Sequence, residues 1–293
     1  MHLVDTHCHI QSSDKLTGDG GEAVTRAMWA KLDHPSGNEL IARANEHDVK
    51  ELICVGCSLP DSQLAVDFVA GRANCYAAIG IHPHEAKDYI FDGGDVKQDG
   101  SMNSPPLDMA KLDQFAALAT SDKVVAVGEC GLDYFYQHSD PASQAAILKF
   151  QIKLALEHDL PLIFHIRDAL DDFWPIFDAL NSSDKPIRGV LHSFTDSQAN
   201  LDKALERGLY IGVNGIVTFT RSESQLEMYK SIPLSRLILE TDSPFLTPSP
   251  CRGSICEPYH ISVTAEFLAN LRKIDLSDLA AATTANAHNL FNL

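Results

Sequence analysis

The stretch HLVDTHCH at residues 2–9 sets a pattern that the rest of the chain repeats. Its apolar, β-branched residues are typical of a buried strand, and polar side chains close the run. Further segments of this kind read ELICVG at 51–56, CYAAIGIH at 75–82, VVAVGE at 124–129, LPLIFHI at 160–166, RGVLHSF at 188–194, LYIGVNG at 209–215 and RLILETD at 236–242. We therefore predict eight buried strands.

The stretches between these strands carry helical periodicity and good helix formers. They span Asn38–Asp48, Asp61–Arg72, Leu107–Ser121, Pro141–Asp159, Ala169–Leu180, Asp196–Arg207 and Ser222–Tyr229. Pro141 suits a first helical turn, and Gly208 suits the position just past a helix end. After the last strand we expect a Pro-rich loop over 243–258 and then two helices reaching Leu293.

This alternation predicts a closed parallel barrel, a (β/α)₈ TIM barrel, as a single domain over residues 1–293. The alternative is an open doubly wound sheet, but DTHCHIQSSD at 5–14 stands where such a sheet carries a Gly-rich phosphate loop. Two segments, Gln11–Gly37 and Tyr89–Pro106, look like insertions. We expect both to be surface loops at the carboxyl ends of the strands.

Composition limits the location and the partners. The start of the chain lacks a basic region followed by a long apolar run, and no apolar stretch approaches the length of a membrane helix. We therefore expect a soluble, unprocessed, cytoplasmic protein with no membrane contact and no obligate protein partner. The net charge of −17 argues against a broad nucleic-acid footprint, which needs clustered Lys and Arg, so any such contact must be local or assisted by metal cations.

The cysteines indicate reduced thiols. Their number, seven, is odd, and Cys54, Cys75 and Cys130 lie within apolar runs. Cys54 and Cys57 have the spacing of half a zinc site, but no second pair with that spacing completes it. We therefore expect no structural zinc site.

Side chains able to bind metal fall at the ends of the predicted strands. They are His7, His9, Glu129, His165, His192 and Asp242. In a parallel barrel all strands end at the same rim, so these side chains converge on one cavity. A lone histidine at a strand end is more often a satisfied rim residue than a ligand. Burying two carboxylates and four imidazoles together without compensating charge is costly, however, so the joint pattern predicts bound divalent metals.

An ordered set of motifs contains these residues. They are DTHCH at 5–9, GIHPH at 80–84, GECGLDY at 128–134, FHIR at 164–167, LHSF at 191–194 and ETDSP at 240–244. The set resembles the TatD family of metal-dependent deoxyribonucleases, and the match covers nearly the whole chain. That family belongs to the amidohydrolase-like hydrolases, so the resemblance implies the (β/α)₈ barrel.

The resemblance also implies the ligand set of two divalent cations, Mg²⁺, Mn²⁺ or Zn²⁺. By position, His7, His9 and Asp242 hold one ion, His165 and His192 hold the other, and Glu129 bridges both. Two metals close together can activate water and stabilise the leaving oxygen in phosphodiester hydrolysis. Asp242 and Glu129 are the candidate catalytic residues. Asp242 is our candidate for the general base, although simple ligation is its alternative role.

Three further motif positions are candidates for substrate contact. His82 and His84 could contact a phosphate or stabilise the turn around Pro83. Arg167 could clamp a phosphate bidentately or form a rim salt bridge.

The remaining motif positions divide into an aromatic run, a loop motif and two cysteines. The aromatic run Tyr134–Tyr136 could stack on a base, or pack as core beneath its loop. Glu257 matches a family loop motif without an assignable chemical step. Strand alternation should point Cys8 and Cys130 away from the ligands, as packing residues.

Three classes of function remain open. The leading hypothesis is an exonuclease on single-stranded DNA, with DNA as substrate. The alternative enzyme hydrolyses a small ester, amide or lactone, which the acidic composition favours. A non-catalytic metal or nucleic-acid binding protein is the third, and the intact set of ligands speaks against it.

Overall fold

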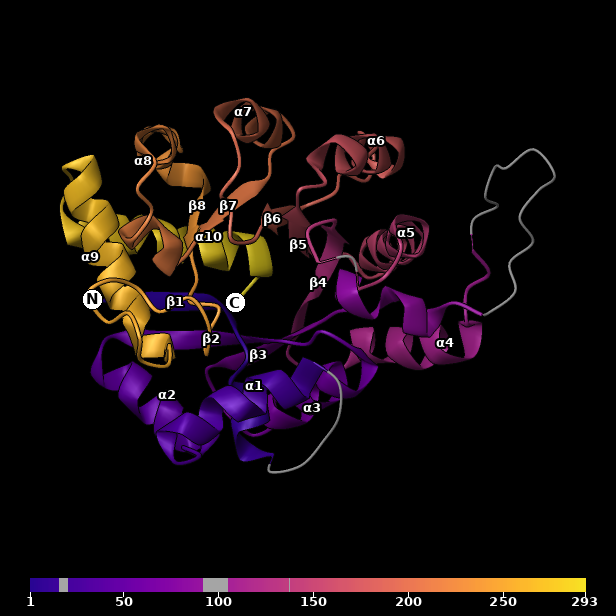
Figure 1. The fold of residues 1–293 in the computed structure, drawn as a ribbon, viewed down its shortest axis with the longest axis horizontal. Helices are drawn as coiled ribbons and strands as arrows, with labels where there is room; N and C mark the ends of the chain where they lie inside the picture. Colours follow the sequence, from indigo (N-terminus) through magenta and orange to yellow (C-terminus); the bar gives the residue numbers. More distant parts are fainter. Residues whose placement is uncertain (16–20, 92–104, 137) are drawn as a thin grey trace. The chain divides into compact units, whose positions relative to one another are not determined.

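The computed structural model describes residues 1–15, 21–91, 105–136 and 138–293. Its strands are β1 (Leu3–Cys8), β2 (Val49–Val55), β3 (Cys75–Ile79), β4 (Val124–Asp133), β5 (Leu162–Arg167), β6 (Gly189–Leu191), β7 (Tyr210–Val213) and β8 (Leu237–Leu239). They form one eight-stranded sheet in the order β1 to β8, and its described pairs are parallel. With alternating helices, the chain has the predicted (β/α)₈ barrel fold (Figure 1).

The helices follow the predicted ranges closely. The α-helices are α1 (Gly21–Trp29), α2 (Gly37–Glu46), α3 (Leu59–Val69), α4 (Met109–Ala117), α5 (Pro141–His158), α6 (Leu170–Leu180), α7 (Gln198–Glu206), α8 (Glu223–Ser231), α9 (Ile261–Arg272) and α10 (Leu276–Phe291). The 3₁₀ helices are η1 (Ile10–Asp14), η2 (Ala30–Leu32), η3 (Pro83–Tyr89), η4 (Leu118–Thr120), η5 (Gly215–Thr218), η6 (Leu234–Arg236) and η7 (Pro258–His260). Pro141 opens α5 behind the cap Asp140, and Gly208 follows α7 with a φ of 74°, as predicted.

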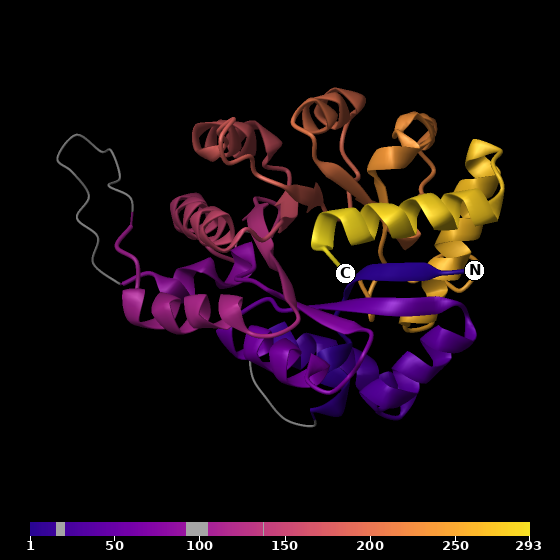
Figure 2. The ribbon, with the colours of Figure 1, turned by 180° about the vertical axis from the view of Figure 1, so that it is seen from behind.

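The chain divides into two compact units. The first comprises residues 1–54, 68–76 and 190–293. In it, α10 packs against β1 and β8, and Figure 2 shows this helix alongside β1. Cys8, the last residue of β1, pairs with Ser243, which follows β8, in a parallel bridge. The first and last strands of the chain are therefore joined within this unit.

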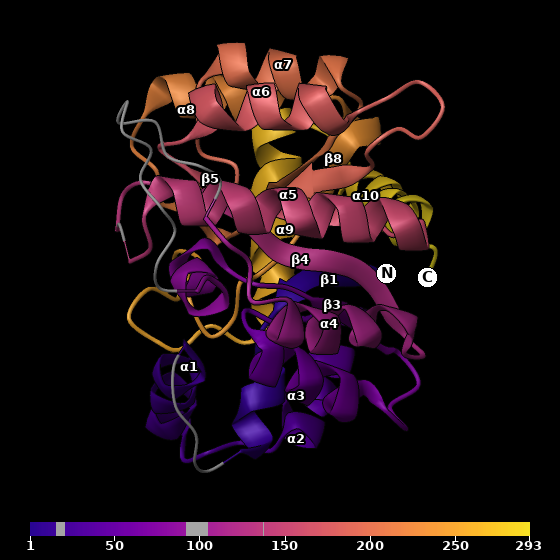
Figure 3. The same cartoon turned by 90° about the vertical axis from the view of Figure 1, so that its right-hand side faces the viewer.

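The second unit comprises residues 55–67 and 77–189. Its helix α5 lies along β4 (Figure 3). Two buried glutamines of α5 fix this packing, because Gln151 bonds both the N–H and the carbonyl of Ile81, and Gln144 does the same for Asp133. Such side-chain pairs satisfy backbone groups that would otherwise be buried without partners.

The two segments predicted as insertion loops are structured where they are described. Within 11–37 the chain forms helices, and Trp29 is fully buried, with its indole N–H donating to the carbonyl of His9 at 3.2 Å. Tyr89 is buried, and its hydroxyl accepts from the N–H of Leu59 at 2.7 Å. The surface-loop prediction was wrong for the described part of 11–37, which forms helices and buries Trp29. Among the described residues of 89–106, only Tyr89, the last residue of η3, is buried, and Phe91 is 54% exposed. Residues 16–20 and 92–104 lie outside the described residues.

Two further observations concern location and thiols. No helix among the described residues is long and apolar enough to cross a membrane. All seven cysteines are free, and Cys54, Cys75 and Cys130 are buried, as predicted for packing thiols.

Gly80, just after β3, provides a test of packing in the second unit. A Cβ at this position would lie 2.2 Å from the Glu129 nitrogen and 2.3 Å from the Gly128 carbonyl carbon, both backbone atoms. We expect Gly80→Ala to lower the free energy of unfolding by about 2 to 3 kcal/mol. Urea unfolding measures this change in the free energy of unfolding. The control is Gly208→Ala, which meets nothing within 4 Å and should cost only about 1 to 2 kcal/mol for its positive φ. A smaller loss at Gly80 than at Gly208 would contradict the packing argument.

Candidate metal centre

The junction of β1 and β8 brings His7, His9 and Asp242 together in the first unit. The N–H of Asp242 donates to the carbonyl of His7, and the N–H of His9 donates to the carbonyl of Ser243, each at 2.8 Å. Asp242 has a φ of 62°, a conformation that Asp tolerates better than most residues. Its Oδ1 lies 3.3 Å from His9 Nε2 and 3.8 Å from His7 Nε2. Backbone pairing thus sets the spacing of three potential ligands.

The Asp242 carboxyl is ionised in this setting. Its burial alone would raise its pKa, but the hydrogen bond with His9 and the charges of His192 and His7 outweigh burial and lower the pKa. His7 is fully buried and His9 nearly so. A carboxylate among buried imidazoles is a donor set suited to a divalent cation.

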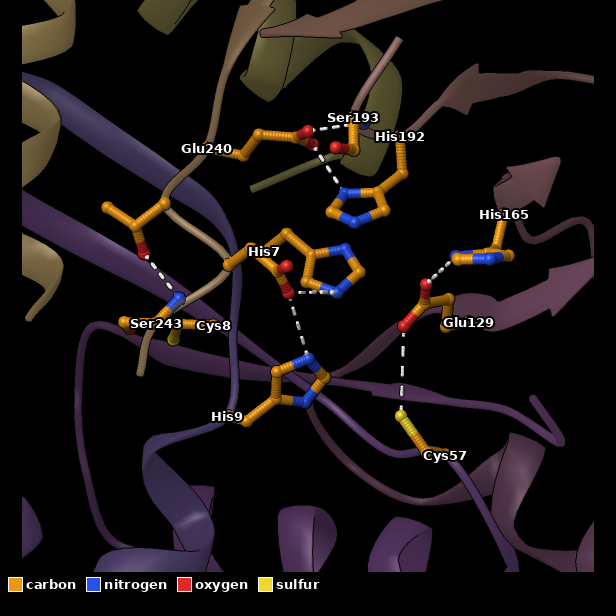
Figure 4. Close-up of polar contacts among 12 residues, drawn as sticks. His7, Cys8, His9, Cys57, Glu129, His165, His192, Ser193, Glu240 and Ser243 are labelled. Atoms are coloured by element: carbon orange, nitrogen blue, oxygen red, sulfur yellow. Dashed lines mark hydrogen bonds and ion pairs between the residues drawn. The ribbon is translucent and has the colours of Figure 1, made fainter. Parts of the chain in front are cut away.

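His192, just after β6, adds a fourth imidazole to this unit. Its ring stacks on that of His7, with centroids 3.6 Å apart, and its Nδ1 lies 3.0 Å from Oε2 of the buried Glu240 (Figure 4). The other oxygen of Glu240 accepts from the N–H of Ser193 at 2.5 Å. The contact of Glu240 with His192 resembles the carboxylate–histidine pairs that orient metal-bound histidines.

Asp5 stabilises the same junction of β1 and β8 through hydrogen bonds. Its carboxyl accepts from the N–H of Thr241 at 2.9 Å and from the Thr241 hydroxyl at 2.6 Å. Burial raises the pKa of Asp5 to about 7, against these hydrogen bonds. Our sequence interpretation missed both Asp5 and Glu240. The signal for Glu240 was its place in the ETDSP motif, two residues before Asp242.

The second unit holds a separate group around Glu129. Its Oε1 lies 2.7 Å from His165 Nδ1, and its Oε2 lies 3.7 Å from the thiol of Cys57 (Figure 4). The same Oε1 lies 3.7 Å from His82 Nε2. Glu129 was predicted to close its strand, but β4 continues to Asp133, so Glu129 lies inside it. It remains 4% exposed, a buried carboxylate facing imidazoles.

Asp133, at the end of β4, connects His165 with His84. Its Oδ2 lies 3.0 Å from His165 Nε2 and 3.1 Å from His84 Nε2. Burial alone would raise the pKa of Asp133, but its bonds to His165 and His84 outweigh burial and lower it. Burial opposes protonation of His165, yet the hydrogen bonds to Asp133 and Glu129 raise its pKa to about 9. Asp133 also escaped the sequence interpretation, although it stands within the GECGLDY motif.

Of the two roles considered for His82 and His84, the structure shows stabilisation of the turn around Pro83, and contact with a phosphate stays a prediction. His82 Nδ1 accepts from the N–H of His84 at 3.1 Å, which caps η3 around Pro83, while its other nitrogen faces Glu129. Burial lowers the pKa of His82 well below its usual value, so this imidazole is neutral. His84 is partly exposed beside Asp133.

Arg167 and the aromatic run Tyr134–Tyr136, the other candidates for substrate contact, lie partly as predicted and partly not. Arg167 is exposed, and its guanidinium lies over the Phe135 ring instead of forming an ion pair in the described part of the chain. Phe135 and Tyr136 are exposed, so core packing was the wrong interpretation for them. Tyr134 is half-buried and donates its hydroxyl to Asp172 at 2.9 Å.

The loop residue Glu257 has a structural role here. Its carboxylate pairs with Arg43 Nε at 2.6 Å, and it forms a capping box with His260 at the start of η7. This explains its place in the loop without a chemical step. The packing expectation holds for Cys8 and Cys130, which are both fully buried.

These donor groups fit divalent cations. In each of three groups, the ligand atoms lie within 4.8 Å of one another: His7, His9 and Asp242; His7, His192 and Glu240; and His82, Glu129 and His165. Mixed imidazole and carboxylate donors match the preferences of Zn²⁺ and Mn²⁺. His165 and His192 belong to different units, so their joint ligation of one ion, and the bridging by Glu129, stay predictions.

Asp133→Asn tests the second unit's support of its ligands. The amide cannot supply the charge that holds His165, so we expect Mn²⁺ affinity to fall about 10- to 100-fold while circular dichroism is unchanged. Isothermal titration calorimetry on metal-stripped protein measures the affinity. Asp171→Asn, at an exposed residue of α6, is the matched control. Equal affinity in wild type and Asp133→Asn would show that Asp133 does not support the metal.

The comparisons with known proteins cover nearly the whole chain. The family model "TatD related DNase" matches residues 4–292. An uncharacterized metal-dependent hydrolase of Bacillus subtilis is 34% identical over 291 residues, with 99% of both chains covered. A protein of Citrobacter rodentium described as the 3'-5' ssDNA/RNA exonuclease TatD is 34% identical over 280 residues, with 94% of this chain and 97% of that protein covered.

A solved structure agrees with these matches. The crystal structure of a TatD homologue from Escherichia coli K12 superposes with a TM-score of 0.74 at 26% identity, covering 99% of this chain and 98% of the other. Sequence, fold and ordered motifs thus agree over the same residues. The chain belongs to the TatD family of metal-dependent hydrolases.

Proposed function

We propose that this protein is a deoxyribonuclease that uses two divalent cations and degrades single-stranded DNA from an end. The observation that carries the proposal is the position of the Asp242 carboxylate, whose Oδ1 lies 3.3 Å from His9 Nε2 and 3.8 Å from His7 Nε2. It places a proton acceptor within a ligand group, as hydrolysis by water requires. The relative described as a 3'-5' ssDNA/RNA exonuclease supports the substrate class.

In this proposal each cation is held by residues that the family motifs supply. As the family resemblance implies, His7, His9 and Asp242 would hold one ion, His165 and His192 would hold the other, and Glu129 would serve both. Divalent cations in such sites activate water and neutralise charge on the phosphoryl group. Histidine-rich ligand sets suit Zn²⁺ or Mn²⁺ better than Mg²⁺.

The protein's own residues then bind the substrate and move a proton. Asp242 accepts a proton from the attacking water, for which its lowered pKa keeps it ready at neutral pH. The exposed guanidinium of Arg167 binds phosphate oxygens, since its planar donors match their geometry. His84, partly exposed beside Asp133, is the second phosphate contact on our proposal.

The second candidate is hydrolysis of a small ester, amide or lactone. The net charge of −17 favours it, because a neutral substrate meets no bulk repulsion. A non-catalytic binding protein is the weakest candidate, since all six predicted ligands are present.

One experiment separates the candidates. Metal-stripped protein is incubated with single-stranded DNA and with a panel of small esters and lactones, and Mg²⁺, Mn²⁺ or Zn²⁺ is added back. We expect cleavage of DNA on addition of metal, and its loss in Asp242→Asn, because the amide cannot accept a proton. Hydrolysis of the small esters alone would favour the second candidate. Near wild-type activity of Asp242→Asn at unchanged metal content would remove Asp242 from the role of base.

The charge conflict generates a second test. With −17 net charge, attraction of a polyanion must come from the cations and a few donors such as Arg167. Neutralising Z phosphates of a single strand gives a salt slope near −0.7Z, and we expect Z of only about 2 to 3. Affinity for a short oligonucleotide, with catalysis blocked and metal fixed, is measured over a potassium chloride series. A slope implying about six contacts or more would reveal a basic groove that this proposal lacks.

A further inference from the structure

Two neighbouring aromatic side chains in the second unit are turned to solvent. Phe135 is 55% exposed and Tyr136 is 51% exposed. Their rings lie edge to face, with centroids 4.8 Å apart and planes at 85°. Paired aromatic rings on a surface are a common feature of ligand sites, because their exposure costs stability that burial would supply.

One carboxylate ties these rings to the metal ligands. The N–H groups of Phe135 and Tyr136 both donate to Oδ1 of Asp133 at 3.0 Å. The other oxygen of Asp133 faces His165 and His84. The aromatic pair is therefore positioned by the same side chain that orients a candidate ligand.

A cation lies over the same pair. The guanidinium carbon of Arg167 is 4.0 Å from the centroid of Phe135 and 4.8 Å from that of Tyr136. Such contacts hold the guanidinium plane in place and leave its edge able to bind phosphate oxygens. The two rings thus offer an apolar face, and the guanidinium of Arg167 offers a cationic edge.

Histidine rings continue the row toward the ligand group. The His138 ring is nearly parallel to that of Tyr136, at 18° with centroids 5.8 Å apart. His84 lies 5.4 Å from Tyr136 and 4.3 Å from His82, which faces Glu129. Ring contacts therefore run from Tyr136 through His84 to His82, whose Nε2 lies 3.7 Å from Glu129 Oε1.

We propose that Phe135, Tyr136 and Arg167 form a stacking platform for an unpaired nucleobase next to the phosphodiester that is cleaved. The proposal rests on the proposed nuclease function and names the part of the substrate that the metals do not contact. An unpaired base offers its π face to aromatic rings, whereas a base inside a duplex is already stacked, so the platform selects single strands. Every base has such a face, so sequence preference is weak.

Binding to a hydrolysis-resistant strand tests the platform independently of catalysis. A short single-stranded phosphorothioate oligonucleotide is compared, in Mn²⁺, with one whose terminal residues are abasic, by fluorescence anisotropy. We expect Phe135→Ala/Tyr136→Ala to weaken binding of the base-containing strand about tenfold and to leave the abasic strand unchanged. Phe135→Tyr and Tyr136→Phe should restore binding. Phe91→Ala, at a phenylalanine 54% exposed elsewhere, is the control.

Any other result of the binding measurement overturns the proposed platform. Equal weakening for both strands would indicate a merely structural role, and no weakening, or no binding by the wild type, would exclude base stacking there. Cleavage is assayed separately with unmodified DNA. Base-dependent binding without cleavage would refute the nuclease function and support the platform, whereas cleavage without base dependence would refute the platform and leave the nuclease.

Discussion

The joining of β1 to β8 is the constraint on which the first ligand group depends. The backbone bonds from Asp242 to His7 and from His9 to Ser243 bring residues from opposite ends of the sequence to adjacent positions. Asp5 holds the same turn by bonding Thr241 through both carboxylate oxygens. The backbone therefore fixes the spacing at which the imidazoles and the carboxylate face one another. Such preorganisation lowers the cost of forming a site.

Much of this arrangement could be predicted from the sequence. The apolar runs that end in His, Glu or Asp predicted the strands. Parallel topology implied that His7, His9 and Asp242 meet, as they do within the first unit. Periodicity carries this information because buried strands have few polar residues, which makes those at their ends conspicuous. Glu129 was placed at a strand end that the structure extends to Asp133, because Gly131 and Leu132 give no sign of where pairing stops.

The supporting residues were harder to predict for a physical reason. Glu240 and Asp133 act through pairs with His192 and His165, and these partners are distant in sequence, so local patterns do not reveal them. The exposure of Phe135 and Tyr136 was likewise hidden, since an aromatic run usually indicates core. Only the tertiary position of the turn after β4 decides between packing and exposure.

On the proposed nuclease function, Asp133 also explains how an acidic chain would hold a polyanionic strand locally. One Asp133 oxygen faces the candidate metal ligand His165, and the other accepts from the backbone N–H groups of Phe135 and Tyr136. One side chain therefore positions both a candidate metal ligand and the aromatic pair. Bulk repulsion acts over about a Debye length, roughly 8 Å at physiological salt, whereas stacking and metal charge act on contact. A strand whose end reaches the site gains both attractions together. On the same proposal, the net charge of −17 discourages binding elsewhere along the strand, which favours action at an end over cleavage within a long chain.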